Sequence, residues 1–286
     1  MVENMILAVI NIYKPGKYLN YINKNLKILS NNNIDIFLSI NDSEDYEDKL
    51  YSSSHIKFVS KHFQNIMPAV GFNEGITYGI EHNYDFCYFI DQDSLINSGT
   101  LKTLEEVVER EKNFSFLASK VVSEEDGSNL RYFRGILNKS MTFHSVKPRD
   151  YQNMISINAA GYTGILVNLD LIKEQKIYID ESYQIELDDY DFTLRLAKVL
   201  PGYMVCKSEI THPNKKDSRN NWLGETLDAY LQLFFMKRVG RDYLHIQNYR
   251  KLINRYGWGA FSIFKKKLMK NNKIDSILIR IKGAVR

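Results

Sequence analysis

The chain has 286 residues, of which 44% are hydrophobic and 25% are charged, and its formal net charge is +4. These values are typical of a globular protein, with one large domain or one domain and an appendage, that folds without a disulfide framework or a structural metal. No apolar run approaches the roughly 18 residues of a membrane-spanning helix, and the N-terminal run is too short for a signal peptide. The two cysteines, Cys87 and Cys206, lack CxxC spacing and are expected to be reduced core thiols.

Strand-like and helix-like segments alternate along residues 5–210. The strand-like segments are short, apolar and bounded by turn residues, and they span 5–13, 34–40, 55–60, 84–90, 114–122 and 203–210. The helix-like segments span 17–31, 68–82, 99–112, 169–175 and 188–199. Residues 155–168 are also strand-like, and the polar stretch 123–153 is predicted to be a hairpin or a loop. This alternation predicts an α/β fold with a mainly parallel sheet covered by helices on both faces.

The C-terminal region, 221–286, is predicted to be helical, aromatic and basic. Residues 237–286 contain fourteen Lys or Arg and two acids, a net charge of +12 that leaves −8 for the rest of the chain. Two interpretations remain open: the helices pack on the preceding domain, or they attach the protein to an anionic lipid surface through apolar residues such as Phe261 and Phe264. The expected location is therefore cytoplasmic, either free or peripheral on the inner face of the plasma membrane.

The motif Asp91-Gln92-Asp93 is the strongest local signal. It follows directly on an apolar strand, and ligands bind at the carboxyl ends of strands in parallel sheets. Two neighbouring carboxylates repel each other, and a divalent cation that prefers oxygen ligands, Mn²⁺ or Mg²⁺, relieves this repulsion. Asn41 and Asp42 follow the second strand and are expected at the same edge of the sheet. The alternative is a solvated turn, because Asp and Ser favour turns.

A second acidic cluster opens the predicted helix 188–199: Asp188, Asp189 and Asp191, preceded by Glu186. A helix N-terminus favours acidic residues, and Asp191 and Arg195 are spaced for an i, i+4 ion pair. Capping and pairing explain some of these carboxylates, but four of them within six residues repel one another. One of them is therefore a candidate general base.

His212 follows the last predicted strand, which places it at the same sheet edge as Asp93. A lone histidine is more often structural, but a neutral imidazole at this place is suited to complete a metal site.

Motifs of several other functional classes are absent from the sequence. No GxxxxGK[ST] or GxGxxG phosphate loop, GxSxG elbow, HExxH motif or zinc-type Cys/His array occurs. The basic tail contains aromatic residues but no recognisable nucleic-acid-binding module, so no nucleic acid partner is expected.

Four motifs occur in order along residues 5–215. The first is the opening strand with Tyr13 and Pro15 and then Asn41-Asp42-Ser43, and the second is Asn65, Met67, Ala69 and Asn73-Glu74-Gly75. The third is Phe89-Ile90-Asp91-Gln92-Asp93-Ser94, and the fourth joins Ala160-Gly161-Tyr162-Thr163-Gly164, Ile179-Asp180-Glu181 and Asp188-Asp189-Tyr190-Asp191-Phe192-Thr193-Leu194-Arg195. In this order they resemble family 2 glycosyltransferases of the GT-A fold, and more narrowly the bacterial rhamnosyltransferase-like branch. Met67 stands where that family carries glycine, and Asp188 stands where glutamate is commoner.

The resemblance implies an inverting, metal-dependent glycosyltransferase. It implies that Asp189 is the catalytic base and that the cation, Mn²⁺ or Mg²⁺, is bound by Asp91, Asp93 and His212. The residues implied to bind the nucleotide are Tyr13, Asn41, Asp42, Asn73 and Asp91. Those implied on the acceptor and donor-sugar side are Gly161, Tyr162, Asp188, Asp191 and Arg195. The implied donor is dTDP-rhamnose or a UDP-hexose, and the implied acceptor is a glycan or lipid-linked saccharide of a bacterial cell-surface polysaccharide.

The expected domains are a GT-A catalytic domain over 1–220, with a nucleotide-sugar half at 1–98 and an acceptor half at 99–220, and the helical basic region 221–286. Two other functions remain open. A sugar-1-phosphate nucleotidyltransferase needs a glycine-rich loop with Arg and Lys after the first strand, and residues 13–16 do not provide one. Against a non-catalytic module that binds sugars or nucleotides stand the intact Asp91, Asp93, Asp189 and His212.

Overall fold

The computed structural model describes residues 5–41, 47–129, 134–136, 143–146, 153–183, 187–213, 248, 251–252 and 254–256. The chain divides into two compact units, Met1–Gly135 with Ser145–Lys216 and Ile136–His144 with Asp217–Arg286. Most of the predicted helical region 221–286 lies outside the described residues. Its described residues, at 248, 251–252 and 254–256, are helical, and Asn248, Leu252 and Tyr256 are buried.

The first unit is built on one nine-stranded sheet. Its strands are β1 (Ile6–Tyr13), β2 (Asp35–Asn41), β3 (Ile56–His62), β4 (Phe86–Asp91), β5 (Leu95–Ile96), β6 (Phe116–Ser123), β9 (Met154–Ile157), β10 (Ile165–Asn168) and β11 (Gly202–His212). The helices are α1 (Leu19–Asn31), α2 (Met67–Glu81), α3 (Thr100–Arg110), α4 (Leu169–Gln175) and α5 (Asp188–Leu196), with 3-10 turns η1 (Gly16–Tyr18) and η2 (Glu47–Lys49). The strands β7 (Arg134–Ile136) and β8 (Phe143–Ser145) form a separate two-stranded sheet.

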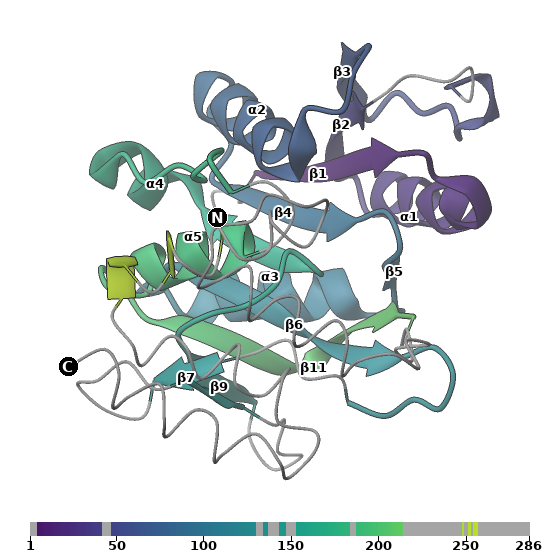
Figure 1. The fold of residues 1–286 in the computed structure, drawn as a ribbon. Helices are drawn as coiled ribbons and strands as arrows, with labels where there is room; N and C mark the ends of the chain where they lie inside the picture. Colours follow the sequence, from purple (N-terminus) through teal and green to yellow (C-terminus); the bar gives the residue numbers. More distant parts are fainter. Residues whose placement is uncertain are drawn as a thin grey trace, which may run out of the picture. The chain divides into compact units, whose positions relative to one another are not determined.

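The order of the large sheet is β3-β2-β1-β4-β10-β6-β11-β5, and β9 also pairs with β11 (Figure 1). The strands β1, β2, β3, β4, β6 and β11 run in one direction, whereas β5, β9 and β10 run against them. The predicted α/β fold with a mainly parallel sheet is confirmed. The sheet is nevertheless mixed, because three of its described strands are antiparallel to their neighbours.

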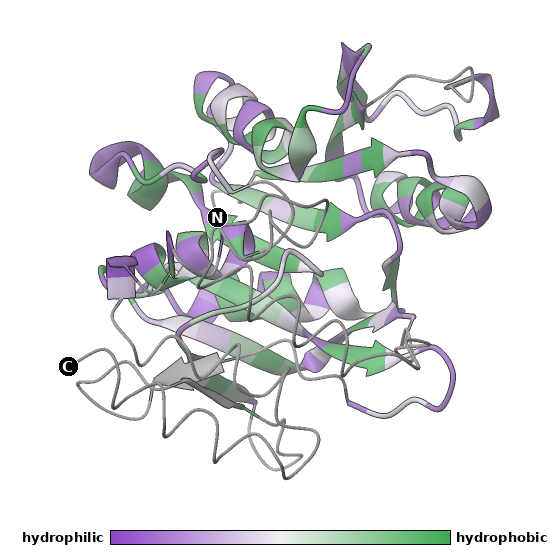
Figure 2. Ribbon diagram, viewed as in Figure 1, coloured by the Kyte–Doolittle hydropathy of each residue, from purple (hydrophilic) through white to green (hydrophobic). Residues whose placement is uncertain are grey.

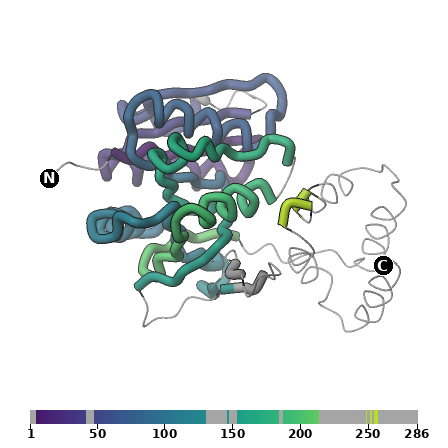
Figure 3. Tube along the Cα trace, turned by 90° about the vertical axis from the view of Figure 1, so that its left-hand side faces the viewer, coloured from purple at the N-terminus to yellow at the C-terminus, as the bar shows by residue number. Residues whose placement is uncertain are grey.

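The strand-like stretch 155–168 forms two strands with different partners. β9 pairs with the beginning of β11, while β10 inserts between β4 and β6. Gly164 precedes β10 with a φ of +72°, a conformation that glycine adopts without strain, and its amide donates to the carbonyl oxygen of Phe89 at 3.1 Å. The green segment of the chain therefore returns to the sheet that the purple segment began (Figures 1 and 3).

Helices cover the two faces of the sheet, as the handedness of its crossovers requires. β1–α1–β2 crosses in one direction along the sheet and β3–α2–β4 crosses in the other, so right-handed connections place α1 and α2 on opposite faces. α2 packs closely on β1: a Cβ at Gly71 would lie 2.1 Å from Asn11 Oδ1, and one at Gly75 would lie 2.6 Å from Val9 Cγ1. Only a helix face without side chains permits this approach.

The core lies between the helices and the sheet. The central strands β1 and β4 are almost wholly buried and apolar, as their green colour in Figure 2 shows. Cys87 and Cys206 are both buried and form no disulfide. In the part of the chain that the structure describes, no helix combines the length and apolar character needed to cross a bilayer.

Candidate active site

The turn after β4 carries the Asp91-Gln92-Asp93 motif. The amide of Ser94 donates to the carbonyl oxygen of Asp91 at 3.0 Å and closes the turn. The Gln92 side chain donates to the carbonyl oxygen of Tyr13 at 2.9 Å and accepts from the Tyr13 amide at 2.8 Å. Gln92 therefore fixes the turn against the end of β1, and it leaves Tyr13, which is 37% exposed, at the same edge of the sheet.

Asp93 and His212 meet at this edge although they are far apart in the sequence. His212 Nε2 lies 3.1 Å from Asp93 Oδ1, and both side chains are largely buried. The strand β5 begins two residues after Asp93 and pairs Leu95 with Thr211, the residue before His212. This short antiparallel pairing, which the sequence analysis did not predict, brings the carboxylate and the imidazole together.

The hydrogen-bonding pattern of His212 defines which nitrogen faces Asp93. Nδ1 lies 2.9 Å from the carbonyl oxygen of Pro213, and because a carbonyl only accepts, Nδ1 carries a hydrogen. In a neutral imidazole Nε2 is then a bare acceptor that faces a carboxylate, and this contact needs either a second proton or a cation. Burial by itself lowers the pKa of His212, but the hydrogen bond and the charge of Asp93, together with the charge of Asp91, raise this pKa overall.

This pair fits a divalent cation. An oxygen and a nitrogen 3.1 Å apart are close enough to hydrogen-bond to each other when the imidazole is protonated, and close enough to bind one cation together when it is not. No group of three or more His, Cys, Asp or Glu suited to hold a metal is found among the described residues. Mg²⁺ is usually held by one or two carboxylates together with substrate phosphates and water, so two protein ligands with Asp91 nearby suffice for such a cation.

Asp91 links the turn to the N-terminus of α5. The hydroxyl of Thr163 donates to Asp91 Oδ2 at 3.2 Å. The pKa of Asp188, the first residue of α5, is raised to about 7: burial is the largest cause, the negative charges of Asp91 and Asp191 add to it, and hydrogen bonds from nearby backbone amides act against it. The two acidic clusters therefore act on each other electrostatically.

Asp191 and Arg195 form the ion pair that their helical spacing predicts. Arg195 Nε donates to Asp191 Oδ2 at 2.9 Å, and the hydroxyl of Tyr183 donates to Asp191 Oδ1 at 3.4 Å. Arg195 Nη2 also donates to the carbonyl oxygen of Tyr178 at 2.7 Å. This pair, with Asp191 fully buried, ties α5 to the segment 178–183, and the roles predicted for both residues on the acceptor side stay predictions.

Asp189 lies beside this pair but is only half-buried. Its Oδ1 accepts from the amide of Tyr190 at 2.7 Å, and its carbonyl oxygen accepts from the hydroxyl of Thr193 at 2.7 Å. The hydroxyl of Thr193 in turn accepts from the amide of Ala160 at 3.1 Å. Thr193 thereby holds the start of α5 next to the stretch that contains Gly161.

Tyr162 stands in an aromatic cluster below the acidic N-terminus of α5. Its ring centroid lies 4.7 Å from that of Phe72, 5.7 Å from that of Phe89 and 6.4 Å from that of Phe192. Burial raises the pKa of Tyr162, and the charges of Asp188 and Asp189 raise it further, so the phenol stays protonated. Among the described residues, its buried hydroxyl has no hydrogen-bond partner.

Two predicted nucleotide-binding residues lie in different surroundings. Asn73, on α2, donates to the carbonyl oxygen of Ile179 at 2.9 Å and to Glu181 Oε1 at 2.8 Å, and it accepts from the amide of Ile179 at 2.9 Å. The side-chain carboxamide of Asn73 is therefore bound to the segment before α5, and a nucleotide contact by Asn73 stays a prediction. Asn41, at the end of β2, is 2% exposed, and its Oδ1 has no partner among the described residues. Asp42 and Glu186 lie outside the described residues.

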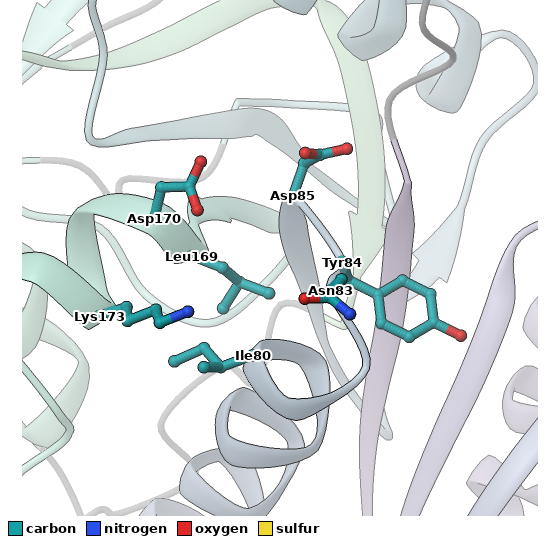
Figure 4. Close-up of a pocket in the computed structure, with 7 residues that line it drawn as sticks. All are labelled: Ile80, Asn83, Tyr84, Asp85, Leu169, Asp170 and Lys173. Carbon is teal, nitrogen blue, oxygen red and sulfur yellow. The ribbon is translucent and has the colours of Figure 1, made fainter.

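A pocket of 160 Å³ lies at the opposite edge of the sheet (Figure 4). Its lining residues come from the end of α2, the approach to β4 and the start of α4: Ile80, Asn83, Tyr84, Asp85, Leu169, Asp170 and Lys173. Asn83, Tyr84 and Asp85 of this lining precede β4, whereas Asp91 ends it, and a six-residue strand separates the two places by about 20 Å. The pocket is therefore not part of the acidic site.

Comparison with known proteins gives structural likeness without sequence likeness. No family model matches the chain, and no curated protein matches it. The S. aureus TarS fragment 1–349 in complex with UDP-GlcNAc superposes with a TM-score of 0.56 at 16% identity, over 95% of this chain and 77% of the fragment. The mannosyltransferase PcManGT from Pyrobaculum calidifontis, in complex with GDP-Man and Mn²⁺, superposes with a TM-score of 0.52 at 10% identity, over 100% of this chain and 81% of that enzyme.

The chain has the GT-A fold. Its mixed sheet with flanking helices matches these solved structures over nearly its whole length.

Proposed function

We propose that this protein is an inverting, metal-dependent glycosyltransferase that uses a nucleotide-diphosphate sugar. The observation that carries the proposal is the Asp93–His212 pair, 3.1 Å apart, at the carboxyl edge of the parallel strands. Its support is twofold. An imidazole acceptor facing a carboxylate is suited to a cation, and structures of the same fold have been captured with UDP-GlcNAc and with GDP-Man and Mn²⁺.

Asp93 and His212, with Asp91 beside them, would hold Mn²⁺ or Mg²⁺ on the diphosphate of the donor. When bound, the cation supplies positive charge that offsets the charge developing on the leaving nucleoside diphosphate. The residues of the chain orient this site: Gln92 fixes the turn to β1, and Thr163 holds Asp91 through its Oδ2. These two contacts fix the position of the Asp91 carboxylate.

Asp189 is proposed as the general base. Its carboxylate takes the proton of the acceptor hydroxyl, the hydroxyl oxygen bonds to the anomeric carbon, and the bond from that carbon to the diphosphate oxygen breaks. Attack from the face opposite the leaving group inverts the configuration of the sugar. Asp189 suits this task because it is half-buried at the N-terminus of α5, whereas Asp191 is fully buried against Arg195.

The nucleotide is proposed to lie over the ends of β1 and β2. Tyr13 offers an exposed ring at this edge, and Asn41 offers a buried side-chain oxygen that accepts no hydrogen bond from the described residues. A nucleobase N–H is the kind of donor such an oxygen requires. Asp42 and Asn73 complete the proposed nucleotide side, and Gly161, Tyr162 and Asp188 the proposed sugar side.

The finer proposals follow from the sequence resemblance. The donor is dTDP-rhamnose or a UDP-hexose, and the acceptor is a glycan or lipid-linked saccharide. Residues 1–98 form the nucleotide-sugar half and 99–220 the acceptor half of the catalytic domain. The basic region 221–286 is proposed to bring this domain to an anionic membrane surface.

Calorimetric titration with UDP, dTDP and GDP, each with Mn²⁺ and with EDTA, tests the proposal. A metal-dependent affinity for one nucleotide is expected, and it should disappear in Asp93→Ala. A protein that binds nucleotide equally well in EDTA would be a binding module of the same fold rather than a metal-dependent transferase.

A further inference from the structure

Asn25 lies on the buried face of α1 and is bound to the segment that follows Asp93. Its Nδ2 donates to the carbonyl oxygen of Ser94 at 2.7 Å, and its Oδ1 accepts from the amide of Ile96 at 3.0 Å. Asn25 is 1% exposed, so neither bond competes with water. Figure 1 shows α1 and β5 beside each other at the right of the sheet, where they are in contact. The carboxamide thus fixes both ends of the Ser94–Ile96 segment.

This segment leads directly to His212. The two residues of β5 pair with Ile210 and Thr211, the last residues of β11 before His212. Asn97, the residue after β5, continues the contact because its Oδ1 accepts from the hydroxyl of Thr211 at 2.9 Å. A displacement of β5 would therefore move Asp93, and it would either carry the end of β11 with it or break the pairing between β5 and β11.

The same helix reaches His212 by a second route. The hydroxyl of Tyr21 donates to the Glu124 carboxylate, and the amide of Glu124 donates to the carbonyl oxygen of His212 at 3.1 Å. Tyr21 and Asn25 are four residues apart and therefore lie on one face of α1. Burial, and next the hydrogen bond to Glu124, raise the pKa of Tyr21 to about 12. The phenol is therefore protonated, and donates this hydrogen bond, even in alkaline solution.

We infer that Asn25 is a positioning residue that sets the separation of Asp93 and His212, with Tyr21 as a second support on the same helix. The inference rests on the proposed function, because this separation is what adapts the pair to a cation. Groups that orient metal ligands through hydrogen bonds usually contribute strongly to metal affinity. Asn25 touches neither ligand and acts only through β5 and its pairing with β11.

The chain provides a matched control in Asn23, on the same helix. Its Nδ2 donates to the carbonyl oxygen of Lys49 at 2.8 Å, and its Oδ1 accepts from the amide of Tyr51 at 2.7 Å. Asn23 therefore makes the same pair of backbone hydrogen bonds as Asn25, but to a segment that leads to β3 rather than to the acidic turn. Loss of either carboxamide removes one bond to a backbone carbonyl and one from a backbone amide; those of Asn23 are exposed to water, and only those of Asn25 support Asp93.

The test compares Asn25→Leu, Asn23→Leu and Tyr21→Phe in the full chain. Mn²⁺ affinity is measured by electron paramagnetic resonance with UDP, GDP or dTDP at saturation, and the melting temperature of each variant is recorded beside it. Asn25→Leu should bind Mn²⁺ about 10- to 100-fold more weakly than the wild type. Tyr21→Phe, at a more exposed position that tolerates substitution, should show a smaller loss and serves if Asn25→Leu does not fold. Asn23→Leu should lower the melting temperature and leave Mn²⁺ affinity unchanged.

Three outcomes would overturn the inference, and they are distinguishable. Wild-type Mn²⁺ affinity in Asn25→Leu, or in Tyr21→Phe when that variant has to serve, removes the positioning role but leaves the proposed function standing. Equal losses of affinity in Asn25→Leu and Asn23→Leu would assign the effect to general destabilisation. Absence of Mn²⁺ binding by the wild type with all three nucleotides would remove the proposed function and the inference with it.

Discussion

The two acidic clusters of the proposed active site differ in the partner that the fold gives to their charge. Asp93, after β4, faces an imidazole, whereas Asp191, on α5, faces a guanidinium. A guanidinium is permanently charged and cannot bind a metal, while an imidazole loses its proton near neutral pH and then becomes a metal ligand. The basic partner of each carboxylate, rather than the carboxylate itself, therefore separates the proposed metal-binding role of Asp93 from the ion-pairing role of Asp191.

Within α5, Asp189 is half-buried and is the proposed base, whereas Asp191 is fully buried against Arg195. Asp189→Asn should lower turnover by about 10²- to 10⁴-fold, the usual contribution of a general base, and leave nucleotide and Mn²⁺ affinity unchanged. Turnover is followed as nucleoside diphosphate released from the donor. Asp170→Asn, in the first turn of α4 and outside the site, is the matched control. Wild-type turnover in Asp189→Asn would show that the base is a different residue.

Removal of the guanidinium should affect folding rather than metal binding. Arg195→Met leaves Asp191 buried without its cation, which should lower the free energy of unfolding by about 3 kcal/mol in urea titrations. The double variant Asp191→Leu/Arg195→Met should recover most of this loss, because no uncompensated charge remains. A loss below about 1 kcal/mol in the single variant would contradict the view that Asp191–Arg195 is a structural pair.

Asp188 should make the two clusters sensitive to pH. Its pKa in the folded protein, about 7, is raised above the ordinary value of 3.8 by burial and by Asp91 and Asp191. The folded state therefore binds this proton more tightly, and its stability falls as pH rises from about 4 to about 7. In EDTA, Asp188→Asn should be more stable than the wild type at pH 8, and the difference should vanish near pH 4. A difference that is constant with pH would be inconsistent with a raised pKa.

The smallest expected effect concerns the imidazole. A metal must displace the proton of His212, whose pKa is raised by Asp93, so Mn²⁺ affinity should increase between pH 6 and pH 8. His55, which lies 3.2 Å from Asp35 at the start of β2, is a matched histidine–aspartate pair outside the site. His55→Gln should keep the pH profile, and His212→Gln should flatten it. An unchanged profile in His212→Gln would remove His212 from the metal site.

The sequence predicted the first half of the sheet better than the second. Segments such as 5–13 and 84–90 are continuous apolar runs with turn residues behind them, so their local pattern predicts both strand and boundary. β5 and β10 depend on distant partners instead. β5 has only two residues and exists because β11 pairs with it, and β10 inserts antiparallel between two strands that are far apart in the sequence. Such short strands leave no periodic signal.

The acidic residues of the proposed site stand out in the sequence, whereas its carboxamides do not. Asp91, Asp93 and Asp188 are visible as charge clusters after a strand and at a helix start. Gln92 and Asn25 each make a donor and an acceptor bond to a backbone segment, and an asparagine or glutamine in a sequence does not reveal which backbone it binds. The position of Gln92 between two aspartates was the one local signal that could have suggested its role.

The most direct test of the central claim is a donor-hydrolysis screen. Wild-type protein and Asp93→Ala are incubated with UDP-, dTDP- and GDP-sugars in Mn²⁺ or EDTA, and released nucleoside diphosphate is measured. Release from one donor by the wild type in Mn²⁺ is expected, with little release in EDTA or from Asp93→Ala. Equal release in EDTA, or equal release by Asp93→Ala, would contradict the claim that Asp93 and His212 hold the cation on which transfer depends.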